Sequence, residues 1–158
     1  MKIKHYKLLA LCIAIPLAVG ALAGFLTSGS MEAFNQLEKP VLSPPGILFP
    51  IVWTILYVLM GIASYLVLTS GQGKIKIKDA LFTYGLQLFF NFFWSIWFFN
   101  LEWYLFAFVW LLILWVLIFN TIVSFYEISK PAAYLLIPYL LWVTFAGYLN
   151  FSIYLLNG

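Results

Sequence analysis

Charged residues are scarce in this sequence of 158 residues. They make up 8% of it, all eight of its strongly basic residues are lysines, and it has one histidine and one cysteine. Soluble domains carry about 25% charged residues, so this composition, with 65% hydrophobic residues, excludes an ordinary soluble domain and a disordered chain. A single cysteine excludes a scaffold held together by disulfides. What remains is a membrane protein.

Long uncharged segments are what the sequence has instead. A helix needs roughly 20 residues to cross a hydrocarbon core about 30 Å thick, because it rises about 1.5 Å per residue. Five segments are long enough: residues 8–26, 47–69, 80–99, 104–126 and 132–156. Their apolar residues are continuous rather than alternating, which favours helices over barrel strands. We predict an all-α integral membrane protein, a single domain over residues 1–158 that forms a five-transmembrane-helix bundle.

The lysines predict the orientation of this bundle. With five spans, only Lys39 falls on one side of the membrane. The other side holds Lys2, Lys4, Lys7, Lys74, Lys76, Lys78 and Lys130. Because lysines concentrate on the cytoplasmic side, we place the N-terminus inside and the C-terminus outside. The net charge of +3 then reflects topology rather than a nucleic-acid-binding surface.

The first segment can also be interpreted as a cleaved secretory signal. Its apolar run over residues 8–26 is longer than the roughly 7–15 residues of a signal core, so we favour a retained helix. Gly20 and Gly24 within it have the spacing of closely packed membrane helices. One hypothesis is that this pair forms a seam between two copies of the chain.

The connection over residues 27–46 is longer than the usual link between packed helices, and long loops often carry function. Pro40, Pro44 and Pro45 restrict the backbone of its second half, which we expect to be stiff and extended. On the predicted topology this loop lies outside.

Asp, Glu, Lys and Arg are absent from the five segments. His5 lies in the N-terminal tail and Cys12 in the first segment, so neither a nucleophile–base pair nor a cluster with metal-ligand spacing is present. Proton-coupled transporters normally carry an ionisable residue within the membrane, so the absence also argues against that class. We predict no metal and no resident cofactor, and leave open whether the protein is an enzyme.

Amide and aromatic side chains are what the helices offer for recognition. Residues that share one helix face recur on three segments: Trp53 and Tyr57, Gln87, Asn91 and Trp94, and Trp142 and Ala146. Buried amides either join neighbouring helices or line a polar cavity. All three faces lie in the outer half of the membrane or near its middle, on the side of the long loop. A cavity there would suit a flat apolar ligand with polar edges.

Several motifs occur in a defined order along almost the whole chain. They are Leu37-Glu38-Lys39-Pro40 and Pro44-Pro45-Gly46, Trp53 with Leu56-Tyr57, Gln87-x3-Asn91-x2-Trp94-Ser95, and Pro138-Tyr139-Leu140-Leu141-Trp142 with Phe145-Ala146 and Leu149-Asn150. Together with the number of spans, they resemble the TspO/MBR family, the translocator proteins or peripheral benzodiazepine receptors.

The resemblance implies a multi-pass protein of the bacterial cell membrane, often a homodimer, that acts as a sensor or stress regulator. It implies binding of porphyrins, other tetrapyrroles and benzodiazepine-site ligands in a pocket under the first loop. The ligand-binding positions of the family fall on Phe34, Trp53, Tyr57, Asn91, Trp94, Trp142 and Ala146, with Pro44 and Gln87 as additions.

Other activities follow from the resemblance as alternatives. Some bacterial members degrade protoporphyrin in light and oxygen, and the two tryptophans implicated correspond to Trp53 and Trp142. A ligand transporter is a further alternative. Sterol binding is not expected, because the motif proposed for animal members needs a basic residue after its tyrosine, and none follows Tyr148 or Tyr154.

Overall fold

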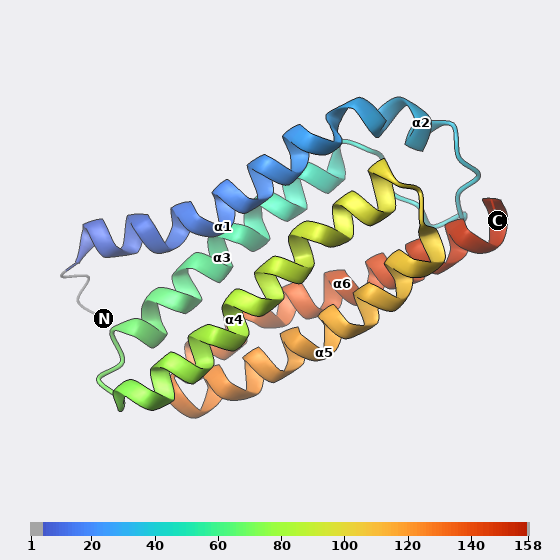
Figure 1. Cartoon of the computed structure of the whole chain (residues 1–158). Coiled ribbons are helices and arrows are strands. Elements are labelled where there is room, and N and C mark those ends of the chain that lie inside the picture. The colour runs from blue at the N-terminus through green and yellow to red at the C-terminus, as the bar shows by residue number, and fades with distance from the viewer. Residues whose placement is uncertain (1–4, 158) are drawn as a thin grey trace.

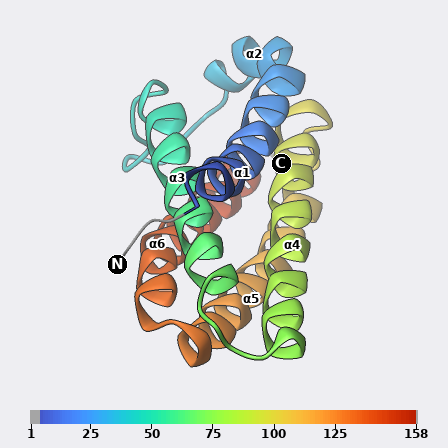
Figure 2. The same cartoon turned by 90° about the vertical axis from the view of Figure 1, so that its left-hand side faces the viewer.

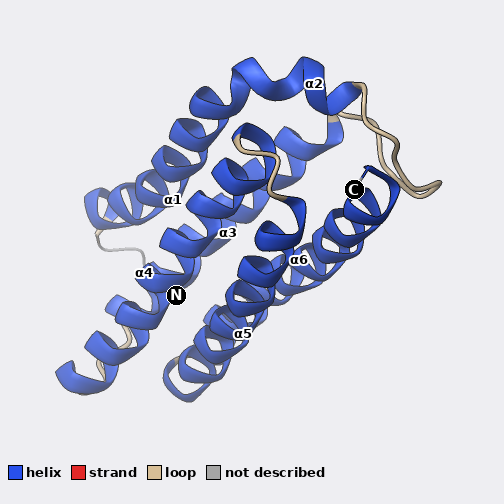
Figure 3. Cartoon of the chain, turned by 45° about the vertical axis from the view of Figure 1, so that its right-hand side comes forward, coloured by secondary structure: helices blue, strands red, loops and turns tan. Residues whose placement is uncertain are grey.

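The computed structural model describes residues 5–157, and within that range every element is helical (Figure 3). Five long helices form the bundle: α1 (Tyr6–Thr27), α3 (Leu48–Leu68), α4 (Lys74–Ser95), α5 (Tyr104–Ile128) and α6 (Lys130–Asn157). Three short elements join them: the 3-10 turn η1 (Ser28–Ser30), α2 (Met31–Asn35) and the π-helical turn η2 (Ile96–Asn100). The predicted all-α five-helix bundle is confirmed.

Four of the long helices, α1, α3, α5 and α6, are apolar over a length that can cross a membrane. The remaining helix, α4, already begins at Lys74, and its first turns carry Lys76, Lys78 and Asp79. Its apolar part starts at Ala80 and continues into η2. The predicted third span over residues 80–99 therefore corresponds to most of α4 together with most of η2.

The connections of the bundle lie at its two ends. Figure 1 shows the start of α1, the α3–α4 turn and the α5–α6 turn at one end, and α2 and the C-terminus at the other. Five of the lysines predicted to lie inside are at the first of these ends: Lys7, Lys74, Lys76, Lys78 and Lys130. The other two, Lys2 and Lys4, lie outside the described residues. Which end faces the cytoplasm stays a prediction from the lysine distribution.

The first loop is shorter than predicted. We expected a loop over residues 27–46, but helical turns continue through η1 and α2 to Asn35, and only residues 36–47 are non-helical. The reason is that polar residues such as Ser28 and Glu32 lower hydropathy without stopping a helix, and Ser28 keeps helical backbone angles. The prolines that do stop a helix begin at Pro40, inside the non-helical part, as expected.

Close packing between α1 and α3 depends on two glycines. A Cβ at Gly61 would lie 2.7 Å from the carbonyl oxygen of Cys12, and a Cβ at Gly20 would collide with the ring of Tyr57. Gly20 thus faces α3 of its own chain, as small residues do where membrane helices approach each other. Gly24, by contrast, is exposed and a Cβ there would meet nothing within 4 Å, so a seam between two copies at this part of α1 stays a prediction.

Candidate ligand-binding pocket

A cavity of about 640 Å³ lies at the α2 end of the bundle. Its walls come from α1, α3, α6 and the α4–η2 segment, and residues of η1, α2 and the loop after it complete the lining. The volume lies within the roughly 300–1,000 Å³ typical of small-molecule sites. The cavity therefore has the size of a binding pocket, and it lies under the first loop.

Six of the nine predicted site residues line this cavity: Phe34, Trp53, Tyr57, Trp94, Trp142 and Ala146. They come from α2, α3, α4 and α6, so folding brings together residues that are far apart in the sequence. Helices α3 and α6 each contribute two residues four positions apart, Trp53 with Tyr57 and Trp142 with Ala146, because this spacing keeps both on one face.

Aromatic rings make up the inner wall of the cavity. Trp53 stacks on Tyr57 with ring centroids 5.6 Å apart, and it meets Trp142 edge to face at 6.4 Å and 87°. On the opposite side Trp94 stacks on Phe98 at 5.1 Å. Flat and perpendicular rings at these distances favour a flat, unsaturated ligand.

One polar group in this wall has no partner. The Nε1–H of Trp142 is buried, and no acceptor lies within hydrogen-bond distance among residues 5–157. The indole N–H of Trp94, by contrast, donates to Asn150 Oδ1 at 3.0 Å, and Asn150 Nδ2 donates to the backbone oxygen of Tyr104 at 2.8 Å. An unpaired buried donor of this kind costs free energy.

The other three predicted residues do not line the cavity. Pro44 is half-buried beside Ser43, which does line it. Gln87 and Asn91 are buried below the cavity, in contacts between helices. For these two amides the structure shows the helix-joining role that the sequence left open as the alternative to a polar cavity.

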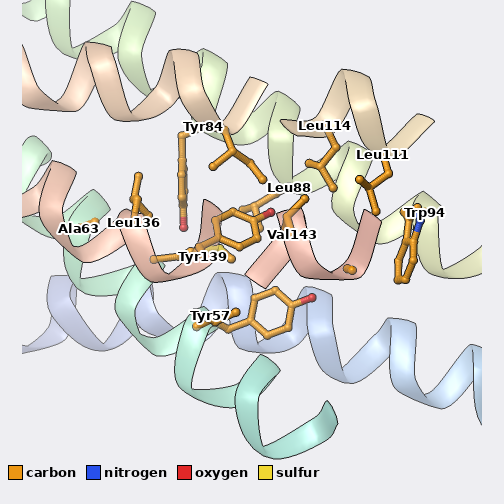
Figure 4. Packing of buried hydrophobic residues seen from close by; sticks show 14 of the residues in the cluster. Tyr57, Ala63, Tyr84, Leu88, Trp94, Leu111, Leu114, Leu136, Tyr139 and Val143 are labelled. Carbon is orange, nitrogen blue, oxygen red and sulfur yellow. The ribbon is translucent and has the colours of Figure 1, made fainter. Parts of the chain in front are cut away.

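The amides form a continuous chain of hydrogen bonds. Tyr57 Oη donates to Asn91 Oδ1 at 2.8 Å, Asn91 Nδ2 donates to Tyr139 Oη at 2.8 Å, and Tyr139 Oη donates to Gln87 Oε1 at 2.6 Å. The chain ties α3, α4 and α6 together in the layer of the core that contains Tyr57 and Tyr139 (Figure 4). It also fixes Tyr57, whose ring lines the cavity, so Asn91 acts on the pocket through Tyr57.

Replacing Asn91 with leucine is expected to destabilise the protein by about 1–3 kcal/mol, because both Tyr57 and Tyr139 lose a buried partner. Thermal unfolding in detergent or lipid measures the change. Asn120→Leu on α5 is the matched control, since Asn120 is exposed, and it should leave the unfolding temperature nearly unchanged. Equal unfolding temperatures for the two variants would contradict this role of Asn91.

A cover of aromatic and polar contacts closes the α2 end of the cavity. Phe34 packs against Phe49, Phe98 and Phe99 with centroid distances of 5.1–6.3 Å, and Lys39 Nζ lies 4.9 Å from the Phe34 ring centroid. At the end of α6, the Asn157 side chain accepts from the backbone N–H of Glu38 and donates to its carbonyl. These contacts hold α2 and the loop against the bundle.

Two groups stand out among the lining residues that sequence reasoning missed. The first lies on α1, which contributed no predicted site residue but supplies Gly20, Ala21 and Gly24. The second is Phe98 and Phe99 in η2, and π-helical turns often occur at functional sites. The glycine spacing on α1 was the available signal, although it was interpreted as a contact between copies.

The chemistry of the lining is limited to packing and hydrogen bonding. No lining residue carries an ionisable carboxylate, imidazole or amine. Within residues 5–157, no group of three or more His, Cys, Asp or Glu side chains is arranged to hold a metal ion. The pocket can therefore enclose and orient a ligand through aromatic contacts and a few hydrogen-bond donors and acceptors.

Fold and pocket together define a multi-pass membrane protein with an aromatic ligand-sized cavity at one end of a five-helix bundle. The sequence model of the TspO/MBR family matches residues 12–156, and the chain belongs to this family. It is 43% identical to the tryptophan-rich protein TspO of Chlorobaculum tepidum over 98% of both chains. It is 42% identical to the TspO of Archaeoglobus fulgidus, over 96% of this chain and 97% of the relative.

A sensory protein and a mammalian protein are among the more distant relatives. The tryptophan-rich sensory protein of Cereibacter sphaeroides is 35% identical over 94% of this chain and 92% of its own. The translocator protein of Bos taurus is 34% identical over 85% of this chain and 83% of its own. The family therefore extends from prokaryotes to mammals, with this chain most similar to prokaryotic members among those compared.

Proposed function

We propose that this protein binds a porphyrin or related tetrapyrrole in the cavity under the first loop, and that it does so in the cell membrane of a prokaryote as a sensor or stress regulator. The ligand is held by Phe34, Trp53, Tyr57, Trp94, Trp142 and Ala146, with Asn91 and Gln87 supporting the wall from below and Pro44 supporting the loop. Benzodiazepine-site ligands, which are also flat and aromatic, bind the same cavity.

The observation that carries this proposal is the pair Trp53 and Trp142. Their rings stand perpendicular and 6.4 Å apart in a cavity of about 640 Å³, so one flat ligand can stack on one indole and meet the edge of the other. The name of the Cereibacter sphaeroides relative, a sensory protein, supports a signalling role.

The test is a titration of the purified protein with protoporphyrin in the dark, followed at the porphyrin absorption band. Wild type should show saturable binding, and Trp53→Phe/Trp142→Phe should bind at least about tenfold more weakly, which is about 1.4 kcal/mol. Trp110→Phe/Trp115→Phe is the matched control, because both residues lie on α5 outside the cavity lining. Equal affinity of all three proteins would reject the proposed pocket.

Light- and oxygen-dependent degradation of protoporphyrin is the second candidate function. It is favoured by the contact between Trp53 and Trp142, since two adjacent indoles facing a bound porphyrin can be oxidised without a general base. Illumination of the same samples tests it. Loss of the porphyrin band must be faster than in a protein-free control and must depend on Trp53 or Trp142.

The proposal includes two features of the assembly. We infer a homodimer from the family, with its seam elsewhere than at Gly20, because Gly20 faces Tyr57 of its own chain. Movement of the ligand across the bilayer is a further alternative. Flux of protoporphyrin into sealed vesicles, compared with flux for the Trp53→Phe/Trp142→Phe variant, distinguishes transport from binding alone.

A further inference from the structure

One side of the cavity wall is incomplete. The lining residues that are exposed all come from α1, η1 and α3: they are Ala21, Gly24, Ser28, Pro50 and Thr54. The remaining lining residues are buried or half-buried, including every one on α4, η2 and α6. The cavity therefore opens to the outside of the bundle between α1 and α3.

Gly20 and Gly24 show how this opening arises. They lie about one turn apart on the same face of α1. A Cβ at Gly20 would collide with Tyr57 on α3, whereas a Cβ at Gly24 would meet no heavy atom within 4 Å. The two helices touch at Gly20 and have separated by Gly24. Figure 2 shows α1 and α3 diverging from their crossing towards the end that carries α2.

The edges of the opening are apolar apart from Ser28 and Thr54, and Ser28 Oγ is paired because it donates to the backbone oxygen of Phe25 at 2.8 Å. Thr54 is the only hydroxyl residue on its α3 side, and Thr54 Oγ1 donates to the backbone oxygen of Pro50 at 2.7 Å, so it is already paired. Large apolar side chains flank the opening on the outer surface: Phe25 is 75% exposed, Ile51 51% and Ile55 55%. Such a surface on a membrane protein faces hydrocarbon rather than water.

The α2 end offers no comparable opening. Phe34 closes it by packing on three phenylalanines, and Asn157 holds Glu38 through two hydrogen bonds of 3.1 and 2.9 Å. Ser30 Oγ donates to Asn100 Oδ1 at 2.6 Å, which ties η1 to η2. A ligand that passed the loop would have to break these contacts, whereas one that passed between α1 and α3 would meet Ala21, Gly24, Pro50 and Thr54.

We propose that the ligand enters and leaves laterally from the bilayer, through the slot between Ala21 and Gly24 of α1 and Pro50 and Thr54 of α3. This inference rests on the proposed binding function and deepens it. It assigns the ligand to a chemical class, namely flat apolar molecules that dissolve in the membrane before they bind. Gly24 and Ala21 determine the rate of exchange because their small size keeps the slot open.

The experiment measures association and dissociation rates of protoporphyrin in the dark, with wild-type protein in lipid nanodiscs and porphyrin absorption as the signal. Gly24→Leu and Ala21→Leu place a large apolar side chain in the slot. Ala18→Leu is the matched control, since Ala18 is exposed on the same helix but does not line the cavity. Asn157→Ala releases the loop and probes the competing route.

Both slot variants should lower the association and dissociation rate constants by at least about tenfold, because an obstruction slows both directions. Ala18→Leu and Asn157→Ala should exchange ligand at wild-type rates. Wild-type rates in both slot variants, or faster exchange in Asn157→Ala, would overturn the lateral route.

The affinities separate this inference from the function on which it rests. A slot variant that loses affinity through faster dissociation alone would show that residues 21 and 24 shape the pocket and not the route, and would overturn the inference. If the slot variants bind protoporphyrin saturably and exchange it at wild-type rates, the lateral route is rejected and the binding function stands. Failure of wild type to bind in a saturable way rejects the binding function itself.

Discussion

Gly61→Leu is expected to abolish the native packing of α1 against α3. A Cβ at this position would lie 2.7 Å from the Cys12 carbonyl oxygen and would press on the backbone of Ile13. Backbone cannot rotate away as a side chain can, so the helices must separate. We expect a loss of at least about 3 kcal/mol, the upper end of the usual cost of overpacking.

The unfolding temperature of the purified protein, measured beside Gly85→Leu, tests this expectation. Gly85 also lies within a helix, but it is exposed and a Cβ there meets nothing within 4 Å. Leucine should be tolerated at position 85 or should stabilise α4, because glycine is about 1 kcal/mol less favourable than alanine in a helix. If both variants unfold at the wild-type temperature, α1 and α3 do not pack as described.

Ala146→Trp is expected to remove ligand binding with little effect on folding. Ala146 lines the cavity on the same face of α6 as Trp142, one turn away. An indole at this position extends into the cavity and takes the volume that the ligand needs. The affinity for protoporphyrin should fall at least about a hundredfold, or roughly 2.7 kcal/mol.

Leu141→Trp is the control for this variant. Leu141 lies on the same helix, is 64% exposed and does not line the cavity, so its replacement adds a tryptophan away from the pocket. Both variants should be followed at the porphyrin absorption band, since an added tryptophan changes the protein fluorescence. Wild-type affinity in Ala146→Trp would mean that the ligand binds outside this cavity.

The two variants test different parts of one arrangement. Gly61 lies where α1 and α3 touch, and Gly24 lies where the same helices have separated. Because α1 and α3 touch at one end and are separated at the other, a cavity forms between them. The cavity is thus a consequence of helix crossing, stabilised below by the Tyr57–Asn91–Tyr139–Gln87 hydrogen-bond chain.

Most of the bundle could be predicted from hydropathy alone. In a bilayer the backbone N–H and C=O groups must pair with each other, so a long continuous apolar segment crosses it as a helix. The bounds of α4, which contains most of the third predicted span, and the bounds of the first loop were predicted less well. Helix α4 begins at Lys74, before its apolar part, and helical turns continue after α1 through η1 and α2. Hydropathy shows which residues suit hydrocarbon, and it does not show how far a helix extends beyond them.

The sequence by itself determined which residue types share each helix face, because that depends only on the helical period. It therefore grouped Trp53 with Tyr57 and Trp142 with Ala146, and the family motifs assigned these residues to one pocket. Only the tertiary structure decided how each helix is rotated about its axis. That rotation depends on contacts between distant residues, and it turns Asn91 and Gln87 into the helix interface while opening the cavity at Gly24.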